Sequence, residues 1–348
     1  MEIGLAKKIL ALYDSSDAIS SISELGEGHI NDTYLITLET GENLVLQKIN
    51  NDILPNVEEI HFNIDLVAAY LNNDRYAQIN YLKSKNGSSF EMVDGYPYRL
   101  MRFIEGSQTV ETTQIPEIAF EAGRIIGTFH MLTEKAPVSK FKITIPDFLN
   151  LQFRLSQFQA ALDGNREHNE TSVSQGIQYV LKTADTFDQI DYNDLQKRVC
   201  HNDTKLNNIL FNDQLEALCL IDLDTIMPGY ILYDFGDAVR TIVNHASEDD
   251  LDQTKISFDE TLFKAFVNGI KSSGIQLSPR EKSSLTLGIA YMPFIHGLRM
   301  LTDHLNGNIY YKVDYPNQNL DRALNLFKFT ELALSKKDNV HSYISEVL

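Results

Sequence analysis

Two short stretches carry the side chains that could do chemistry, HNDTKLNNILF at residues 201–211 and LCLIDLDT at residues 218–225. They place Asp203, then Asn208 five positions later, and Asp222 directly after an apolar run. Transfer of a γ-phosphoryl group needs a carboxylate to take the proton of an acceptor hydroxyl and metal ions to neutralise the triphosphate. Asp203 suits the first role, and Asn208 and Asp222 suit the second. The spacing therefore predicts phosphoryl transfer from ATP with Mg²⁺.

The residues around Asp203 leave two alternatives open. In protein kinases an Asp, four spacers and an Asn precede a short strand, which residues 209–211 would supply here. In that arrangement His201 braces the loop, and Lys205 either reaches the phosphates or is a solvated loop lysine. An Asp- and Asn-rich loop could also be an ordinary turn, since these residues favour turns. Asp222 at a strand end favours the catalytic interpretation.

Asp224 follows Asp222 by two positions. Because strand side chains alternate, both carboxylates can face the same side. Asp224 could then add a second metal contact or bind a substrate hydroxyl, and we favour the substrate role. Asp234, in YDFGDAVR, does not end an apolar strand. It is therefore predicted to be a helix N-cap that braces the loop instead of a metal ligand.

The stretch from 25 to 60 contains parts suited to binding phosphates. Gly26 and Gly28 lie in a turn between two strand-like segments, where the backbone could approach phosphate closely. Lys48 ends the apolar run LVLQK, like the strand lysine of protein kinases that contacts the α- and β-phosphates. Its expected partner is Glu58 or Glu59 on the following helix. The alternative is an exposed edge-strand lysine beside two solvated glutamates.

The adenine site is predicted where the chain would cross between two lobes, in YRLMRFIEG at 98–106. Backbone groups of Met101 and Phe103 would hydrogen-bond the base. Leu210 and Ile221 would supply apolar walls.

The order of the elements predicts how these parts are brought together. Residues 20–105 are rich in strand and turn signals and contain one amphipathic helix at 56–71. Helical patterns dominate from 115 onward. We expect an α+β, two-lobed protein-kinase-like fold, with a small antiparallel sheet lobe carrying one helix at 1–105 and a larger, mainly helical lobe at 106–348. The cleft between the lobes should hold the site.

Composition limits the partners. The chain of 348 residues has 48 acidic and 30 basic residues and a formal charge of −18, which argues against nucleic acid and anionic membranes. Its start lacks the pattern of a secretory signal, and its longest apolar stretch is shorter than the roughly 20 residues that span a bilayer. We expect a soluble cytoplasmic protein. Cys200 and Cys219, the two cysteines, are expected to be buried strand thiols.

The two motifs together resemble the aminoglycoside phosphotransferase/choline kinase superfamily, whose members keep an HxDxxxxN loop followed by an ID strand. More closely, the chain resembles the N-acetylhexosamine 1-kinases, and the similarity extends to GHINDTY, LVLQKIN, PYRLMRFIEGS, GLRMLTDHLNGNIYYKV and NQNLDRAL. The resemblance implies transfer of the ATP γ-phosphate to the anomeric hydroxyl of N-acetylglucosamine or N-acetylgalactosamine. It also implies sugar contacts from His29, Asp224, Arg299 and Tyr310. Arg299 could instead brace Asp303 within its helix.

Other readings remain. Relatives in the superfamily phosphorylate choline, homoserine, methylthioribose or aminoglycosides. A non-catalytic kinase-like module would bind nucleotide without turnover. The DLD at 222–224 could also be the metal-binding acid pair of a sugar-nucleotide glycosyltransferase, although that leaves HNDTKLNN unexplained. The oligomeric state is not readable from the sequence.

Overall fold

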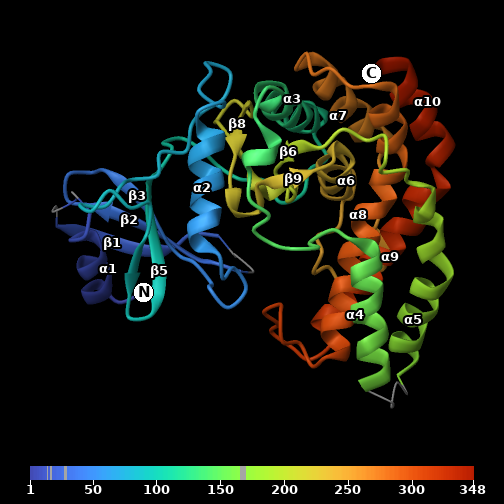
Figure 1. The fold of residues 1–348 in the computed structure, drawn as a ribbon, viewed down its shortest axis with the longest axis horizontal. Helices are drawn as coiled ribbons and strands as arrows, with labels where there is room; N and C mark the ends of the chain where they lie inside the picture. The colour runs from blue at the N-terminus through green and yellow to red at the C-terminus, as the bar shows by residue number, and fades with distance from the viewer. Residues whose placement is uncertain (14, 16–17, 27–29, 165–169) are drawn as a thin grey trace.

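A small sheet lobe and a larger helical lobe lie side by side along the longest axis of the molecule (Figure 1). The computed structural model describes residues 1–348 except 14, 16–17, 27–29 and 165–169. The predicted α+β kinase-like fold is confirmed. Among the described residues, no helix combines the length and the apolar character needed to cross a membrane.

The sheet lobe contains one antiparallel sheet in the order β1-β2-β3-β5-β4. Its strands are β1 (Ile19–Glu24), β2 (Asp32–Leu38), β3 (Asn43–Lys48), β4 (Glu91–Val93) and β5 (Tyr96–Arg102). One face of this sheet packs against α1 (Ile3–Leu10) and forms a separate small core with Ile36, Leu46 and Leu100. The opposite face therefore looks toward the helical lobe.

Helix α2 (Val57–Ala68) is the single helix expected between the strands. It buries Val57, Ile60, Ile64 and Val67, which lie on the predicted apolar face. These side chains join the core of the helical lobe and not the small core under α1. Figure 1 shows α2 standing between the sheet and the helical lobe. The helix thus connects the two lobes as well as covering the sheet.

The helical lobe packs its helices in pairs, with α3 against α7 and α8 against both α6 and α9. Its helices are α3 (Pro116–Thr133), α4 (Leu151–Gly164), α5 (Thr171–Thr183), α6 (Ile231–Ile242), α7 (Glu260–Ser272), α8 (Pro279–Leu305), α9 (Gln318–Ser335) and α10 (Lys337–Val347).

Two short strand pairs frame the loop at 201–208. Strand β6 (Arg198–Cys200) pairs with β9 (Met227–Gly229), and β7 (Ile209–Phe211) pairs with β8 (Ala217–Leu220). Both pairs are antiparallel. Cys200 on β6 and Cys219 on β8 are free and buried, as predicted.

Candidate active site

The loop between β6 and β7 brings Asp203 and Asn208 into contact. The side-chain amide of Asn208 donates to the Asp203 carboxylate at 2.8 Å and to the Asp203 carbonyl oxygen at 2.9 Å. The Lys205 ammonium lies 3.7 Å from the same carboxylate, and the two side chains are 23% and 22% exposed. Residues 206–208 form one turn of 3₁₀ helix that turns Asn208 back toward Asp203. The acid and amide predicted from spacing are therefore neighbours, with Asp203 partly exposed and Asn208 buried behind it.

Lys205 is held near two acids. Burial lowers the pKa of its ammonium, but the negative charges of Asp203 and Asp222 outweigh burial, so the pKa is raised overall. A lysine stabilised in this way stays charged between the two carboxylates. This environment favours the phosphate-reaching alternative over a solvated loop lysine.

The loop is anchored from below by Asp234, which is fully buried in the first turn of α6. Its carboxylate accepts the backbone N–H groups of His201 at 2.9 Å and Asn202 at 2.7 Å. His130 Nε2 lies 2.9 Å from the same carboxylate. His201 itself reaches across the loop, with Nε2 2.8 Å from the Ile221 carbonyl oxygen. Bracing by His201 and Asp234 is as expected, although Asp234 lies inside the helix and Tyr230 is the N-cap.

Asp222 lies just past the end of β8 with a left-handed backbone, φ +59°. The N–H of Ile221 donates to the Asn208 carbonyl oxygen at 2.9 Å, which fixes Asp222 beside the loop. Burial, followed by the negative charges of Asp224 and Asp203, raises the pKa of Asp222 to about 6. A carboxylate whose pKa is raised by two neighbouring acids is a suitable environment for a hard divalent cation.

The prediction that Asp224 is open to substrate or metal is wrong in this structure. Asp224 is 3% exposed, and both of its carboxylate oxygens are occupied. Arg99 of β5 forms a bidentate ion pair with it, and the Asn31 side chain donates to Oδ2 at 2.8 Å. The Arg99 guanidinium holds the pKa of Asp224 below its usual range despite burial. Asp224 therefore connects the lobes and presents no free oxygen to a sugar.

Lys48 does not take the position predicted for it. It pairs across the sheet with Tyr98, on the face that covers α1, and its ammonium lies 3.6 Å from the Tyr96 ring centroid. Among the described residues, no ion pair joins Lys48 to Glu58 or Glu59. The side chain of β3 that faces the helical lobe is Gln47, which accepts from Arg99 Nε at 2.8 Å.

The remaining nucleotide predictions have mixed outcomes. Gly26 lies in the turn after β1 with φ +76°, a conformation that favours glycine, whereas Gly28 and His29 fall outside the described residues. The Phe103 N–H donates to the Asn43 carbonyl oxygen at 3.1 Å, so this amide is not available to adenine. Met101 is buried on the face of β5 that looks toward the helical lobe. Leu210 and Ile221 are half-buried beside the catalytic loop.

Arg299 and Tyr310 lie close together in the helical lobe. The Arg299 guanidinium carbon lies 4.6 Å from the Phe148 ring centroid and 5.6 Å from those of Tyr310 and Tyr311. Its Nη2 is 3.5 Å from the Tyr310 hydroxyl. Arg299 thus lies within a ring of aromatic side chains.

The alternative role of Arg299, bracing Asp303, is not what the structure has. The Asp303 carboxylate accepts three successive backbone N–H groups of the 309–311 segment at 2.9, 2.9 and 3.0 Å. Asn319 donates to it as well, at 3.0 Å. Asp303 therefore shapes the segment that carries Tyr310.

Sequence reasoning missed a buried charged cluster on α6. Arg240 Nε lies 2.7 Å from Asp237 Oδ1 and Nη1 contacts Glu248, while His296 of α8 lies 3.3 Å from the same Asp237 oxygen. Asp237 and Arg240 are three positions apart, a spacing that brings side chains together on a helix surface. That spacing, present in YDFGDAVR, was the available signal.

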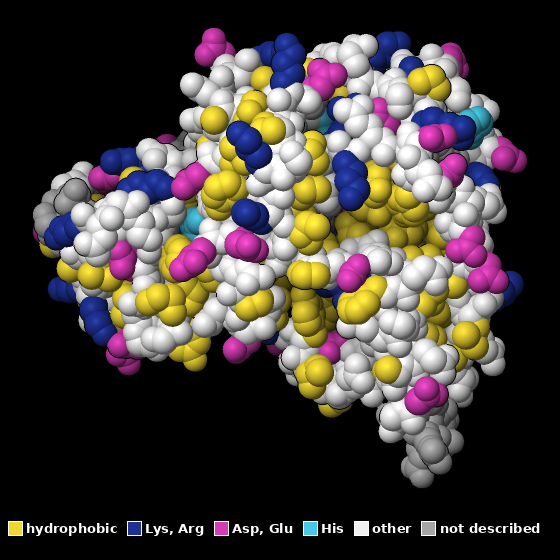
Figure 2. Space-filling view, viewed as in Figure 1, with side chains coloured by type: hydrophobic (Ala, Val, Ile, Leu, Met, Phe, Trp, Pro, Cys, Tyr) yellow, Lys and Arg dark blue, Asp and Glu magenta, His cyan; other side chains and the backbone are white. Residues whose placement is uncertain are grey.

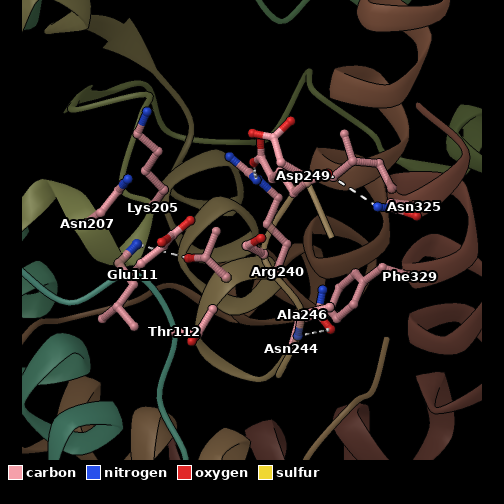
Figure 3. A pocket seen from close by; sticks show the side chains of 15 residues that line it. Glu111, Thr112, Lys205, Asn207, Arg240, Asn244, Ala246, Asp249, Asn325 and Phe329 are labelled. Atoms are coloured by element: carbon pink, nitrogen blue, oxygen red, sulfur yellow. Dashed lines mark hydrogen bonds and ion pairs between the residues drawn. The ribbon is translucent and has the colours of Figure 1, made fainter. Parts of the chain in front are cut away.

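Two cavities adjoin the catalytic loop. The smaller, of about 60 Å³, has polar and charged walls, and Figure 3 shows Lys205 and Asn207 on one side, Arg240 in the middle and Asn325 with Phe329 opposite. The larger, of about 490 Å³, lies between segments 143–152, 187–197 and 227–233. Its walls are mostly aromatic and apolar, and Figure 2 shows hydrophobic side chains gathered in a hollow on the helical lobe. Its lining includes Phe148, whose ring contacts Arg299, and Asn202, next to Asp203.

Comparison with protein-family models finds one match, the phosphotransferase enzyme family, over residues 21–265. The match covers more than half of the chain and includes both the Asp203 loop and Asp222. The chain belongs to this family. As a member of the phosphotransferase enzyme family with a kinase-like fold, it is a small-molecule phosphotransferase.

Solved structures of similar fold include other members of this kind. An aminoglycoside phosphotransferase from Alicyclobacillus acidocaldarius has 12% identity and a TM-score of 0.66, with 98% of this chain and 96% of that chain covered. A microcompartment-associated aminopropanol kinase has 18% identity and a TM-score of 0.64, with 97% and 98% covered. A choline kinase from Streptococcus pneumoniae has 14% identity and a TM-score of 0.59, with 94% and 98% covered. At these identities the likeness supports the fold and leaves the acceptor open.

Proposed function

We propose that this phosphotransferase transfers the γ-phosphoryl group of ATP to the anomeric hydroxyl of an N-acetylhexosamine, giving a sugar 1-phosphate. The observation that carries the phosphoryl-transfer part is the contact of Asp203 with Asn208 beside Asp222 and Lys205. An amicoumacin kinase of similar fold, solved in complex with AMP-PNP and Ca²⁺, supports ATP and a divalent cation as cofactors. An enzyme that uses ATP is expected to work in the cytoplasm.

The chain's own residues divide the work. Asp203, held by Asn208, takes the proton of the acceptor hydroxyl, and Lys205 offers positive charge to the phosphates. Asn208 and Asp222 would hold Mg²⁺, because their oxygen atoms are the ligands that this ion prefers and the negative charges of Asp203 and Asp224 lie near Asp222. When bound, Mg²⁺ neutralises charge on the triphosphate. His201 and Asp234 keep the loop in place while the acceptor approaches.

The acceptor assignment rests on the surroundings of Arg299. A guanidinium framed by Phe148, Tyr310 and Tyr311 offers hydrogen-bond donors beside aromatic faces, a combination that suits a neutral hydroxyl-rich ring. The adjoining cavity of about 490 Å³ has the size of ordinary small-molecule sites, roughly 300–1,000 Å³. The proposed sugar contacts are Arg299 and Tyr310, and His29 stays a prediction because it lies outside the described residues.

A second candidate is an amine-bearing acceptor such as choline, an amino alcohol or an aminoglycoside. The smaller cavity favours it, because Glu111, Glu248 and Asp249 line that space beside Lys205. Its volume of about 60 Å³, however, is room for roughly two water molecules, each with about 30 Å³. The volume therefore favours the sugar. Homoserine and methylthioribose are further candidate acceptors. The alternative of a sugar-nucleotide glycosyltransferase has no support from the family match.

The deciding experiment is a panel assay of Mg²⁺-dependent ADP release with N-acetylglucosamine, N-acetylgalactosamine, choline, aminopropanol, homoserine, methylthioribose and kanamycin. The N-acetylhexosamines should give the highest kcat/KM. Turnover confined to the amines would replace the sugar with the second candidate. Nucleotide binding with no turnover on any acceptor would instead favour a non-catalytic module.

Asp203→Asn tests the base. It should lower kcat by about 10² to 10⁴ because a positioned general base contributes that much. The matched control is Asp74→Asn, a change of the same type at an exposed loop position. Undiminished turnover in Asp203→Asn would remove Asp203 from the proposed role.

A further inference from the structure

A buried ion pair joins the sheet lobe to the helical lobe directly behind Asp222. Arg99, on β5, is fully buried, and its Nη1 and Nη2 both reach the Asp224 carboxylate. A planar guanidinium facing a carboxylate with two parallel hydrogen bonds fixes orientation as well as distance. The two partners come from different lobes, so the pair fixes one lobe relative to the other.

The pair is supported on the sheet side by a closed set of hydrogen bonds. Arg99 Nε donates to Gln47 at 2.8 Å, and Gln47 donates to Thr33 at 3.0 Å. Asn31 donates to Asp224 at 2.8 Å and accepts the N–H of Asn50 at 3.1 Å. The Tyr81 ring lies 5.4 Å from the guanidinium. Arg99 and Asn31 of the sheet lobe thus both contact one carboxylate of the helical lobe, and other residues of the sheet lobe hold these two side chains in place.

The carboxylate belongs to the turn that carries Asp222. Residues 223–225 form one turn of 3₁₀ helix, and Asp222 precedes it in a left-handed conformation that non-glycine residues rarely adopt. On the other side of this turn, Thr225 donates its hydroxyl to the His201 carbonyl oxygen at 2.6 Å. The turn is therefore held from two directions, by Arg99 and by the catalytic loop. Without Arg99, the restraint on this turn from the sheet-lobe side would be reduced to the single hydrogen bond from Asn31.

We propose that Arg99 is a positioning residue for metal binding. Through its ion pair with Asp224 it holds the turn that carries Asp222 and fixes the position of the sheet lobe relative to that turn. The task differs from the one predicted for Lys48, which was to contact the nucleotide phosphates, and Lys48 faces the other side of the sheet. The inference rests on the proposed metal role of Asp222. It assigns no contact between Arg99 and any substrate.

The test measures Mn²⁺ binding in the presence of AMP-PNP by calorimetry, so that it does not depend on turnover or on the acceptor. Arg99→Met should weaken Mn²⁺ binding about 10- to 100-fold, as loss of a residue that orients a metal ligand usually does. Arg99→Lys keeps the charge but loses the planar guanidinium group, so its Mn²⁺ affinity should lie between those of Arg99→Met and the wild type. Asp224→Asn should behave like Arg99→Met. It also serves if Arg99→Met fails to fold.

The matched control is Arg198→Met. Arg198 forms an equally buried, bidentate pair with Glu281, at 2.6 and 3.2 Å, but both partners lie in the helical lobe. Its loss should lower thermal stability and leave Mn²⁺ affinity of the folded protein within about twofold. A merely structural role for Arg99 would give the same result as this control.

The outcomes separate the inference from the proposed function. If Asp222→Asn binds Mn²⁺ as wild type does, the proposed metal role of Asp222 fails. If Asp222→Asn loses Mn²⁺ but Arg99→Lys, Arg99→Met and Asp224→Asn bind it within twofold of wild type, the positioning role of Arg99 is overturned. Graded weakening from Arg99→Lys to Arg99→Met, with Arg198→Met unchanged, supports it.

Discussion

Gly236→Ala is predicted to damage both stability and catalysis through a single methyl group. Gly236 is on α6, where this helix crosses α8. A Cβ there would lie 2.6 Å from the carbonyl carbon of Gly288 and 2.9 Å from Met292 Cγ. Carbon atoms need about 3.5–4.0 Å, so the two helices would have to separate by about 1 Å. Helix backbone cannot turn aside as a flexible side chain can.

The expected loss of folding free energy is at the upper end of the usual range for overpacking, about 3 kcal/mol. The control is Gly4→Ala in α1, where an added Cβ has no neighbour within 4 Å. There the substitution should stabilise the helix by about 0.5–1 kcal/mol, because alanine loses less backbone freedom on folding. The same chemical change is thus predicted to have opposite signs at the two positions.

The catalytic effect follows from Asp234, two positions before Gly236. Its carboxylate holds the His201 and Asn202 N–H groups at 2.9 and 2.7 Å, and a displaced α6 would pull on both bonds. We expect a lower kcat with the KM for ATP little changed, since the sheet lobe is untouched. Urea unfolding and steady-state kinetics of the two variants measure these effects. A Gly236→Ala protein as stable as Gly4→Ala would refute the close crossing of α6 and α8.

Three further predictions concern charge. Because Mg²⁺ or Mn²⁺ needs the ionised carboxylate of Asp222, whose pKa is raised to about 6, metal affinity should rise with pH. Its ionised fraction changes from about 0.1 at pH 5 to about 0.9 at pH 7, so Mn²⁺ binding should tighten about tenfold in calorimetry, and a flat profile would contradict this. Lys48→Met should change the KM for ATP less than about threefold, whereas Lys205→Met should lower kcat about 10- to 100-fold, the worth of a charged hydrogen bond. A loss of activity in Lys48→Met as large as that in Lys205→Met would contradict these two assignments. Arg299→Met should raise the KM for N-acetylglucosamine and leave the KM for ATP unchanged, and the opposite split would remove Arg299 from the acceptor site.

The contact between Asp203 and Asn208 was predictable because it is local. Both residues lie in one loop, and the spacing alone places the amide beside the carboxylate. The orientation of Lys48 was not predictable in this way. Leu44, Val45 and Leu46 are all apolar and all buried, so alternation cannot tell which face of β3 is inward. If the assignment of faces is shifted by one residue along β3, Lys48 and Gln47 exchange sides of the sheet.

The error at Asp224 has a different cause. Asp222 and Asp224 would share a face in an extended strand, but the chain leaves the strand before Asp222. Its positive φ and the following 3₁₀ turn end the strand alternation on which a shared face depends. Arg99, which forms the ion pair with Asp224, is 125 positions away in the sequence. No local pattern contains that information.

The observed positions of Lys48 and Asp224 change the roles expected for the two lobes. Asp203, Lys205, Asn208 and Asp222 all lie in the helical lobe, on a loop tied to α6 through Asp234. The buried cation that the sheet lobe directs at this site is Arg99, and its charge is already matched by Asp224. The positive charge left to face the phosphates in this loop is therefore that of Lys205. A movement of the sheet lobe would then alter how nucleotide is enclosed while leaving the contact between Asp203 and Asn208 intact.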